Sequence, residues 1–265
     1  MATRWAALAA LAMPVTAGLA YMAAFGAPGH YLAINLAGLA AGGILTMLGR
    51  LPPDGRPATG LVAILLALLF VPLATGPEIS GIARWLPLGP VTLHAGMLAI
   101  PGLSVLAARM PEASAPLLLA ALFACFLQPD AAGGFAITFA AVGLHHVTRD
   151  WRAGIVAIIG FFASIVMAVR GELPPVEFVE RVVADAATAS LPAALGLAMA
   201  SIAGFVLILK AAPLEPAARF ALSGSLFGFL MMSVLNHYPA PLIGYGAAPI
   251  LGYGLALGLV RKGAA

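Results

Sequence analysis

Apolar residues occur in long runs along this chain, and short polar stretches separate the runs. A membrane-crossing helix needs about 20 mainly apolar residues. No alternation with a period of two is present, so helices are predicted rather than a β-barrel. The fifth run is short for a span and is followed by Gln128-Pro129-Asp130. The ten predicted helices cover residues 5–25, 31–48, 58–73, 91–108, 115–127, 131–147, 151–169, 191–209, 220–235 and 242–260.

The composition supports an all-α membrane protein. Hydrophobic residues make up 62% of the 265 residues and charged residues 9%, whereas a soluble domain has about 25% charged residues. Ten helices would use about 200 residues, which leaves no room for a soluble domain or a nucleic-acid module. We therefore expect membrane lipids, and no nucleic acid, around the chain. Cys125 is the single cysteine, which excludes an intramolecular disulfide.

The basic residues predict the orientation in the membrane. If the N-terminus is cytoplasmic, the inner connections carry ten Lys and Arg residues and the outer connections carry three, as the positive-inside rule requires. Both termini are then cytoplasmic. The ten are Arg4, Arg50, Arg56, Arg109, Arg149, Arg152, Lys210, Arg219, Arg261 and Lys262, and the three are Arg84, Arg170 and Arg181. The outer connections 74–90 and 170–190 carry charged residues, so chemistry is expected there.

Two pairs of glycines are spaced for close helix packing. Gly38 and Gly42 form one pair, and Gly254 and Gly258 form the other. Small residues four positions apart let two helix backbones approach each other in a membrane. We expect both pairs to pack inside the bundle rather than to form a dimer interface.

Three motifs resemble the SEDS family (shape, elongation, division and sporulation proteins, the FtsW and RodA group). Residues 80–90 read Ser-Gly-Ile-Ala-Arg-Trp-Leu-Pro-Leu-Gly-Pro, similar to the family's Arg-Trp loop that ends in Leu-Gly-Pro and opens the next helix. Residues 127–130 read Leu-Gln-Pro-Asp, as in the family's Leu-Gln-Pro-Asp-Leu-Gly-Thr. Residues 241–248 read Pro-Leu-Ile-Gly-Tyr-Gly-Ala-Ala, against Pro-Phe-Ile-Ser-Tyr-Gly-Gly-Ser. The order of the motifs predicts a single SEDS-like transmembrane domain over residues 1–265.

This resemblance implies a role in peptidoglycan assembly in the bacterial inner membrane. SEDS proteins polymerise a lipid-linked disaccharide precursor on the outer membrane face, with a penicillin-binding transpeptidase as partner, in cell division or cell-shape control. The resemblance implies no particular cofactor for a glycosyltransferase of this type. It leaves open whether a divalent cation takes part. No Cys-x-x-Cys motif or spaced histidine pair predicts a metal site.

The family's catalytic carboxylate lies between the seventh and eighth helices. That stretch of the family contains Asp-Phe-Ile and, further on, Ala-Glu-Glu. Here residues 173–180 read Leu-Pro-Pro-Val-Glu-Phe-Val-Glu, followed by Ala-Asp at 184–185. The resemblance therefore implies that Glu177 is the base and that Asp185 contacts substrate. Glu180 and Arg181 are interpreted as a solvated face.

Four other residues are candidates for substrate binding, each with a structural alternative. Arg84 and Trp85 could bind a pyrophosphate, or they could be interfacial anchors. Asp130 could contact substrate or a cation, or it could cap the helix that follows it. Tyr245 could line the substrate groove, or it could serve tight packing between its flanking glycines.

Two departures from the family count against activity. Met97 stands where the family has an intramembrane glutamate, and Ile100 stands where it has a lysine. Ionisable groups inside a membrane are expensive and are functional by default. Three functions are therefore left open: a SEDS-type enzyme, an inactive SEDS-like scaffold, and a lipid or solute transporter.

Overall fold

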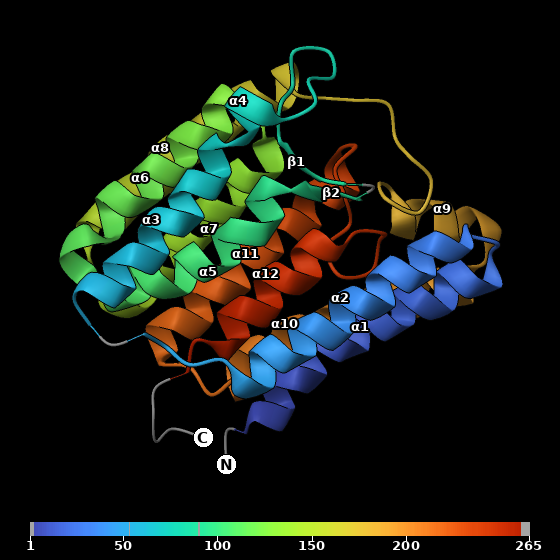
Figure 1. Ribbon diagram of the computed structural model, residues 1–265, viewed down its shortest axis with the longest axis horizontal. Coiled ribbons are helices and arrows are strands. Elements are labelled where there is room, and N and C mark those ends of the chain that lie inside the picture. The colour runs from blue at the N-terminus through green and yellow to red at the C-terminus, as the bar shows by residue number, and fades with distance from the viewer. Residues whose placement is uncertain (1–2, 53, 90, 261–265) are drawn as a thin grey trace.

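The computed structural model describes residues 3–52, 54–89 and 91–260, and these form a bundle of helices with one short β-hairpin (Figure 1). Residues Pro90, Arg261 and Lys262, which entered the sequence-based predictions, lie outside the described residues. The elements are α1 (Arg4–Ala24), α2 (Gly29–Leu48), α3 (Arg56–Phe70), α4 (Pro72–Thr75), β1 (Trp85–Leu88), β2 (Val91–His94), α5 (Ala95–Arg109), α6 (Pro111–Leu127), α7 (Ala131–Thr148), α8 (Trp151–Arg170), α9 (Val182–Ala189), α10 (Leu191–Ala211), α11 (Pro216–Leu235) and α12 (Ala247–Gly258).

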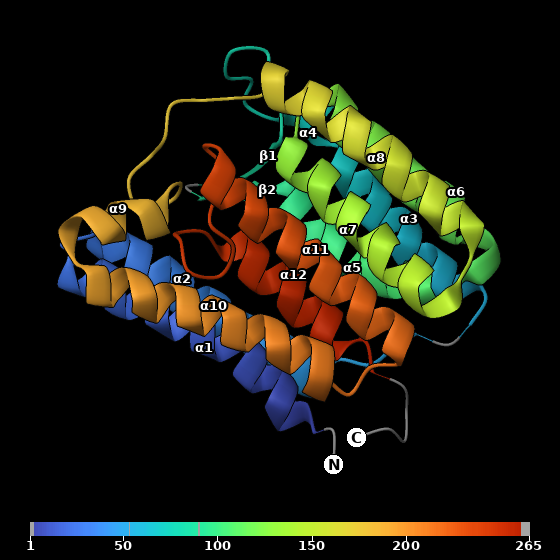
Figure 2. The ribbon, with the colours of Figure 1, turned by 180° about the vertical axis from the view of Figure 1, so that it is seen from behind.

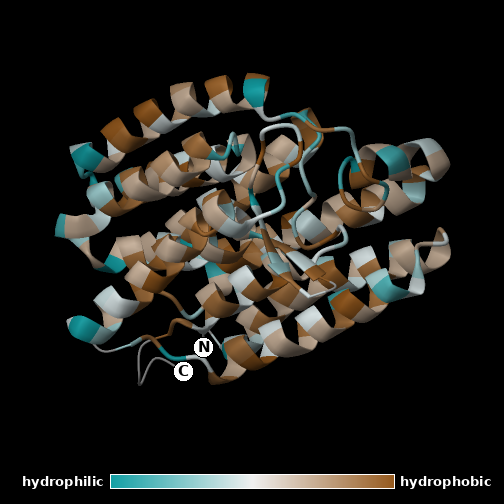
Figure 3. Cartoon of the chain, turned by 45° about the horizontal axis from the view of Figure 1, so that its top comes forward, coloured by the Kyte–Doolittle hydropathy of each residue, from teal (hydrophilic) through white to brown (hydrophobic). Residues whose placement is uncertain are grey.

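The predicted all-α bundle is confirmed: the described residues form ten apolar helices of 12 to 21 residues, with α4 and α9 as short additions. Seven segments of the described chain are long and apolar enough to cross a membrane: α1, α2, α3 together with α4, α7, α8, α10 and α11. The apolar helices α5, α6 and α12 are shorter. Hydrophobic positions run along the helices, and hydrophilic ones gather at helix ends and in loops (Figure 3). The chain is a multi-pass membrane protein.

The long helices form three groups. Helices α5, α11 and α12 lie in the centre, α1, α2 and α10 cover one side, and α3, α6, α7 and α8 cover the other (Figures 1 and 2). Helix α5 is buried along most of its length. By contrast, α8 exposes large apolar side chains such as Phe162 and Val169, as a lipid-facing helix does. The centre of the bundle is therefore protein-enclosed, and the outer helices form the surface that faces lipid.

Glycines bring α2 and α12 into backbone contact, as the sequence predicts. A Cβ atom added to Gly42 would lie 2.8 Å from the carbonyl oxygen of Ile250, and one added to Gly254 would lie 2.6 Å from the Cα of Gly42. A Cβ on Gly258 would collide with the backbone at Leu45. Larger residues would push the two helices apart, so these glycines serve packing within the bundle.

Two helices begin clearly later than predicted. Residues 91–94 form strand β2, which pairs antiparallel with β1, so the fourth helix begins at Ala95 rather than at Val91. The last helix begins at Ala247 rather than at residue 242. Both misassigned stretches adjoin long apolar runs, and hydropathy reports burial rather than helical hydrogen bonding. The two central helices α5 and α12 therefore start late, and non-helical backbone precedes each of them.

The ends of the bundle differ in charge. The Arg4 guanidinium donates to the carbonyl oxygens of Thr46 and Met47, and Leu51 N–H donates to Val260 O, so α1 begins where α2 and α12 end. Eight described basic residues of the predicted inner set lie at this end, and the three of the predicted outer set lie at the other. We call the second end, with the β-hairpin and α9, the loop end. That it faces outward stays a prediction.

Cysteine labelling tests this orientation. Ser80 in the loop end and Glu112 at the opposite end are both exposed. Each is replaced by cysteine, one at a time, in a Cys125→Ser background. We expect a membrane-impermeant maleimide added to intact spheroplasts to label position 80 and not position 112, because the basic end should stay cytoplasmic. Labelling of position 112 from outside would reverse the orientation.

Candidate functional site

Three segments meet at the loop end of the bundle: the β1–β2 hairpin, the loop 171–181 that leads into α9, and the loop 236–246 between α11 and α12. The two loops are hydrogen-bonded to each other, since Tyr245 N–H donates to Phe178 O at 2.7 Å. All three SEDS-like motifs lie in or next to these segments. The candidate site is therefore assembled from parts that are far apart in the sequence.

Arg84 is the charged centre of this region. Its side chain is 1% exposed, and its guanidinium lies 5.0 Å from the ring centroid of Trp85 and 4.8 Å from that of Tyr238. Its Nη1 also donates to Gly171 O at 3.4 Å. Burying a charge is costly unless other groups compensate for it, and the two aromatic faces do part of this. Arg84 is therefore a fixed positive charge beneath the loops.

Asp130 is fully buried and caps α7. Its Oδ1 accepts a hydrogen bond from Gly133 N–H at 3.1 Å, which confirms the capping interpretation. His94 caps α5 in the same way, because its Nδ1 accepts from Met97 N–H at 3.3 Å. Burial lowers the pKa of His94, so the ring is neutral at pH 7 and carries its proton on Nε2. That nitrogen faces Asp130 Oδ1 at 3.7 Å.

Tyr238 joins these groups, and no sequence motif singled it out. Its ring is fully buried against Arg84, and its hydroxyl accepts from Ala131 N–H at 3.2 Å and donates to Gly171 O at 3.5 Å. Burial is also the main reason why the pKa of Tyr238 is raised. We call Arg84, His94, Asp130 and Tyr238 the buried polar cluster.

Part of this cluster is left without hydrogen bonds from the protein. Within the described residues, five buried side-chain polar atoms have no hydrogen-bond partner, and three of them are Arg84 Nε, His94 Nε2 and Asp130 Oδ2. Buried polar atoms are nearly always paired. Such a concentration marks this cluster as the main polar feature of the protein interior.

Glu177, the predicted base, lies in the loop 171–181 and is exposed. The next residue, Phe178, has a φ of 62°, and its ring is buried against Tyr21 with centroids 5.8 Å apart. A bulky residue in the left-handed region is strained, and such strain is typical of functional loops. This turn anchors the phenylalanine and leaves the Glu177 carboxylate outside.

Asp185, predicted to contact substrate, lies on α9 near Glu177. Its Oδ1 is 3.7 Å from Arg181 Nε, and its side chain is 42% exposed. Both Glu177 and Asp185 are close enough to the Tyr21 hydroxyl to interact with it electrostatically. The two predicted site carboxylates thus both lie near the end of α1 that carries Tyr21.

Glu180 differs from the prediction of a solvated residue. It is partly buried, and its Oε2 accepts a hydrogen bond from Val176 N–H at 2.7 Å. Burial raises the pKa of Glu180, and the nearby charges of Arg84 and His237 act in the opposite direction. The sequence missed this because the burial comes from the loop 236–246, which pairs with Glu180 through Pro239. Arg181 is 46% exposed, as expected.

Tyr245 is held by aromatic and backbone contacts. Its ring stacks on Tyr31 with centroids 3.7 Å apart. Asn35 is fully buried and binds the backbone on both sides of Tyr245. Its Nδ2 donates to Gly244 O at 3.0 Å, and its Oδ1 accepts from Gly246 N–H at 2.9 Å. The sequence analysis did not select Asn35, although an amide inside an apolar run was a usable signal. Asn35 fixes this loop to α2.

The structure therefore divides the predicted site residues into two sets. Arg84, Trp85 and Asp130 lie in or against the buried polar cluster, and Glu177, Asp185 and Tyr245 lie in the loops or on α9. Met97 and Ile100 are fully buried in α5 below His94. Among the described residues, no group of three or more His, Cys, Asp and Glu side chains is placed to hold a metal ion.

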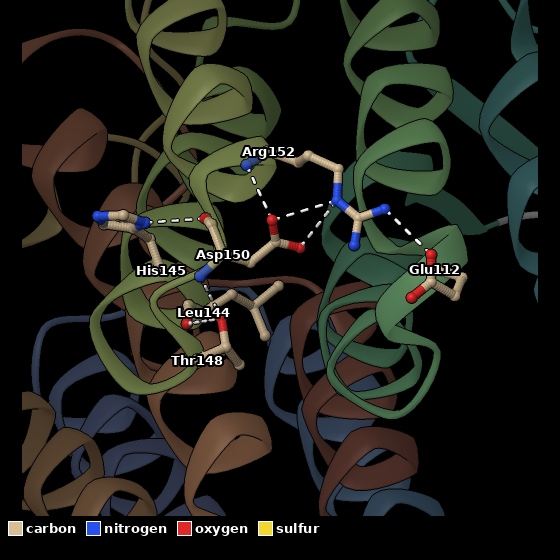
Figure 4. Close-up of polar contacts among 6 residues, drawn as sticks. All are labelled: Glu112, Leu144, His145, Thr148, Asp150 and Arg152. Atoms are coloured by element: carbon tan, nitrogen blue, oxygen red, sulfur yellow. Dashed lines mark hydrogen bonds and ion pairs between the residues drawn. The ribbon is translucent and has the colours of Figure 1, made fainter.

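A second polar network lies at the opposite end (Figure 4). Arg152 Nε is 3.2 Å from both carboxylate oxygens of Asp150, and Arg152 Nη1 donates to Glu112 at 3.2 Å. The hydrogen bond from Arg152 is the main reason why the pKa of Asp150 is lowered. His145 Nδ1 lies 2.9 Å from Asp150 O. These contacts tie the turn between α7 and α8 to the start of α6, and they are separate from the candidate site.

Comparisons with known proteins identify the fold. The sequence matches no protein-family model, and no curated protein sequence matches it. Among solved structures, the rod shape determining protein RodA of Thermus thermophilus aligns with a TM-score of 0.67 and 22% identity over 96% of this chain and 94% of that one. An aspartate-to-alanine variant of that protein aligns with a TM-score of 0.70 and 21% identity, with the same coverage.

A chain from a peptidoglycan synthase complex aligns as well. It has a TM-score of 0.63 and 21% identity, over 96% of this chain and 96% of that chain. Agreement over almost the full length of each chain leaves no large part of the bundle unmatched. The protein therefore has the fold of RodA, which is the fold that the SEDS resemblance of its sequence predicts.

Proposed function

We propose that this chain is a divergent SEDS-type protein of peptidoglycan assembly in the bacterial inner membrane. In this proposal it joins lipid-linked disaccharide units into glycan strands on the outer membrane face. The observation that carries it is that three SEDS-like motifs, separated by up to 150 residues, converge at one end of a RodA-fold bundle. Residues that only support a fold would not need to gather at one end.

The proposed chemistry places a base above a buried cation. The attacking hydroxyl of the acceptor sugar forms a bond to the anomeric carbon of the donor, and the bond from that carbon to the lipid pyrophosphate breaks. Glu177 accepts the hydroxyl proton, because its exposed carboxylate can come within hydrogen-bond reach of a bound sugar. Arg84, positive and protected from water, favours the anionic leaving group through its field rather than by direct contact.

One observation favours the alternative of an inactive scaffold. Met97 and Ile100 occupy fully buried positions in α5, where the resemblance places a glutamate and a lysine. Apolar side chains suit that environment, so the fold tolerates their presence. A scaffold would need the fold and would not need ionisable groups at these positions of α5. The solved peptidoglycan synthase complex with this fold is consistent with a transpeptidase partner in either case.

Polymerisation of purified lipid-linked disaccharide tests the function. The full-length chain is reconstituted with and without a penicillin-binding transpeptidase, and glycan products are resolved by gel electrophoresis. We expect glycan strands, and more of them with the partner present. If the protein still binds the partner but makes no product under either condition, the enzyme hypothesis is wrong and the scaffold hypothesis replaces it.

A further inference from the structure

A polar pocket of about 240 Å³ opens at the loop end, beside the buried polar cluster but outside it. Helix α11, α9 and the two loops form its walls. The residues lining it are Glu172, Arg181, Ala184, Val234, Leu235, Asn236 and His237. Neither the sequence motifs nor the proposed reaction uses this pocket.

The pocket carries opposite charges on its walls. Glu172 Oε1 lies 3.1 Å from His237 Nδ1, and the side chain of Glu172 is 51% exposed. A carboxylate accepts several hydrogen bonds, so Oε2 can bind a further donor. Arg181 lies 3.7 Å from Asp185, which is beyond hydrogen-bond distance and leaves guanidinium N–H groups able to donate into the pocket.

A third donor comes from the end of α11. The side-chain oxygen of Asn236 accepts from the backbone N–H of His237 at 2.7 Å. With the oxygen engaged, the amide NH₂ of Asn236 is the part that can bind a ligand. The pocket thus offers a carboxylate acceptor together with guanidinium and amide donors.

The remaining wall is apolar and continues onto the membrane-facing surface. Val234 and Leu235, in the last turn of α11, are 70% and 71% exposed. Such exposed apolar residues at the end of a membrane-crossing helix face hydrocarbon rather than water. A ligand whose polar part fills the pocket can therefore place an apolar chain along α11.

We propose that this pocket binds the headgroup of a zwitterionic phospholipid that carries a phosphate and a primary ammonium, as phosphatidylethanolamine does. The phosphate accepts from Arg181 and Asn236, and the ammonium donates to Glu172. Acyl chains pass over Val234 and Leu235.

The charges in the pocket favour a headgroup with a phosphate and a primary ammonium over other phospholipid headgroups. A headgroup with only a phosphate would leave Glu172 facing an anion, and like charges at close range are repulsive. A trimethylated ammonium has no N–H to donate to the carboxylate. A primary ammonium next to a phosphate satisfies both walls. This inference stands independently of the proposed enzymatic function, because it concerns a lipid that is not consumed.

Native mass spectrometry of the full-length protein in detergent tests the proposal. Phosphatidylethanolamine, phosphatidylglycerol and phosphatidylcholine with identical acyl chains are titrated separately. We expect the first to bind about tenfold more tightly than the others, since a hydrogen bond to a charged group contributes about that factor. Glu172→Gln should remove this preference, and Arg181→Gln should weaken binding of all three lipids about tenfold.

Arg170→Gln is the matched control. Arg170 is an exposed arginine at the same end of the bundle, where it packs on the ring of Phe126 at 5.9 Å and does not line the pocket. It should leave the lipid preference unchanged. Equal binding of the three lipids to the parent protein, tighter binding of phosphatidylglycerol, or an equal loss in Arg170→Gln and Arg181→Gln would each overturn the proposal. Gel filtration confirms that each variant is folded.

Discussion

Replacing Glu177 by Gln is expected to lower the rate of glycan polymerisation by about 10²–10⁴-fold, the usual contribution of a positioned general base. Glutamine keeps the shape and the hydrogen-bonding oxygen of the side chain and loses the basicity. Glu177 is exposed and Phe178 anchors the loop beside it, so the fold should be unchanged. The initial rate with lipid-linked disaccharide and a saturating transpeptidase partner measures the effect.

Two further variants separate the role of Glu177 from general charge effects. Glu78→Gln removes an exposed carboxylate from the same end of the bundle and should leave the rate unchanged. Glu180→Gln alters the partly buried carboxylate near Arg84. If Glu180→Gln abolishes polymerisation while Glu177→Gln does not, the base is Glu180. Parent rates in Glu177→Gln and in Glu180→Gln would exclude both residues as the base.

Removing the buried carboxylate of Asp130 is expected to destabilise the protein more than any surface change. Asp130→Ala loses the cap of α7, worth about 1 kcal/mol. It also removes the carboxylate that faces the buried His94 Nε2 at 3.7 Å, and leaving a buried polar group without a partner costs about 1–3 kcal/mol. Thermal unfolding in detergent, followed by intrinsic fluorescence, should show a clearly lower midpoint than that of the parent.

Asp150→Ala supplies the matched control, because Asp150 also caps a helix. It accepts from Arg152 N–H at 2.9 Å, and its side chain is 21% exposed. Its loss should cost the capping contribution of about 1 kcal/mol and at most about 1 kcal/mol more for the partly exposed ion pair with Arg152. Asp130→Asn keeps an oxygen for Gly133 N–H and loses the charge, so it should fall between the two alanine variants. Equal effects of Asp130→Ala and Asp150→Ala would show that the buried charge has no role in stability.

The number and order of the long helices could be predicted because lipid imposes a simple rule on sequence. Each span needs a long apolar run, and polar residues mark its ends. The same rule failed at residues 91–94 and 242–246, which adjoin apolar runs yet are not helical. Leu93, His94 and residues 242–244 are buried within the protein rather than exposed to lipid. Their hydropathy therefore carries no information about whether they are helical.

The candidate site was predictable only where a motif marked it. Arg84, Trp85 and Asp130 came from such motifs, and the structure places them together. Tyr238 and Asn35 were missed because they act through partners far away in the sequence: Asn35 binds Gly244 and Gly246. Glu180 was misjudged for the same reason. Local spacing predicts neither long-range contacts nor burial of a loop by another loop.

The late start of α12 has a consequence for depth in the bilayer. Ala247 opens α12 and lies against Gly38 of α2, so a Cβ on Gly38 would be 3.3 Å from the Cβ of Ala247. Gly38 is nine residues after the start of α2 at Gly29, which corresponds to about 14 Å along a helix. The loop 236–246 therefore extends about that far below the top of the neighbouring helix, into a hydrocarbon layer about 30 Å thick. A lipid-anchored molecule could therefore reach Tyr245, which is partly exposed, without its anchor being lifted towards the water.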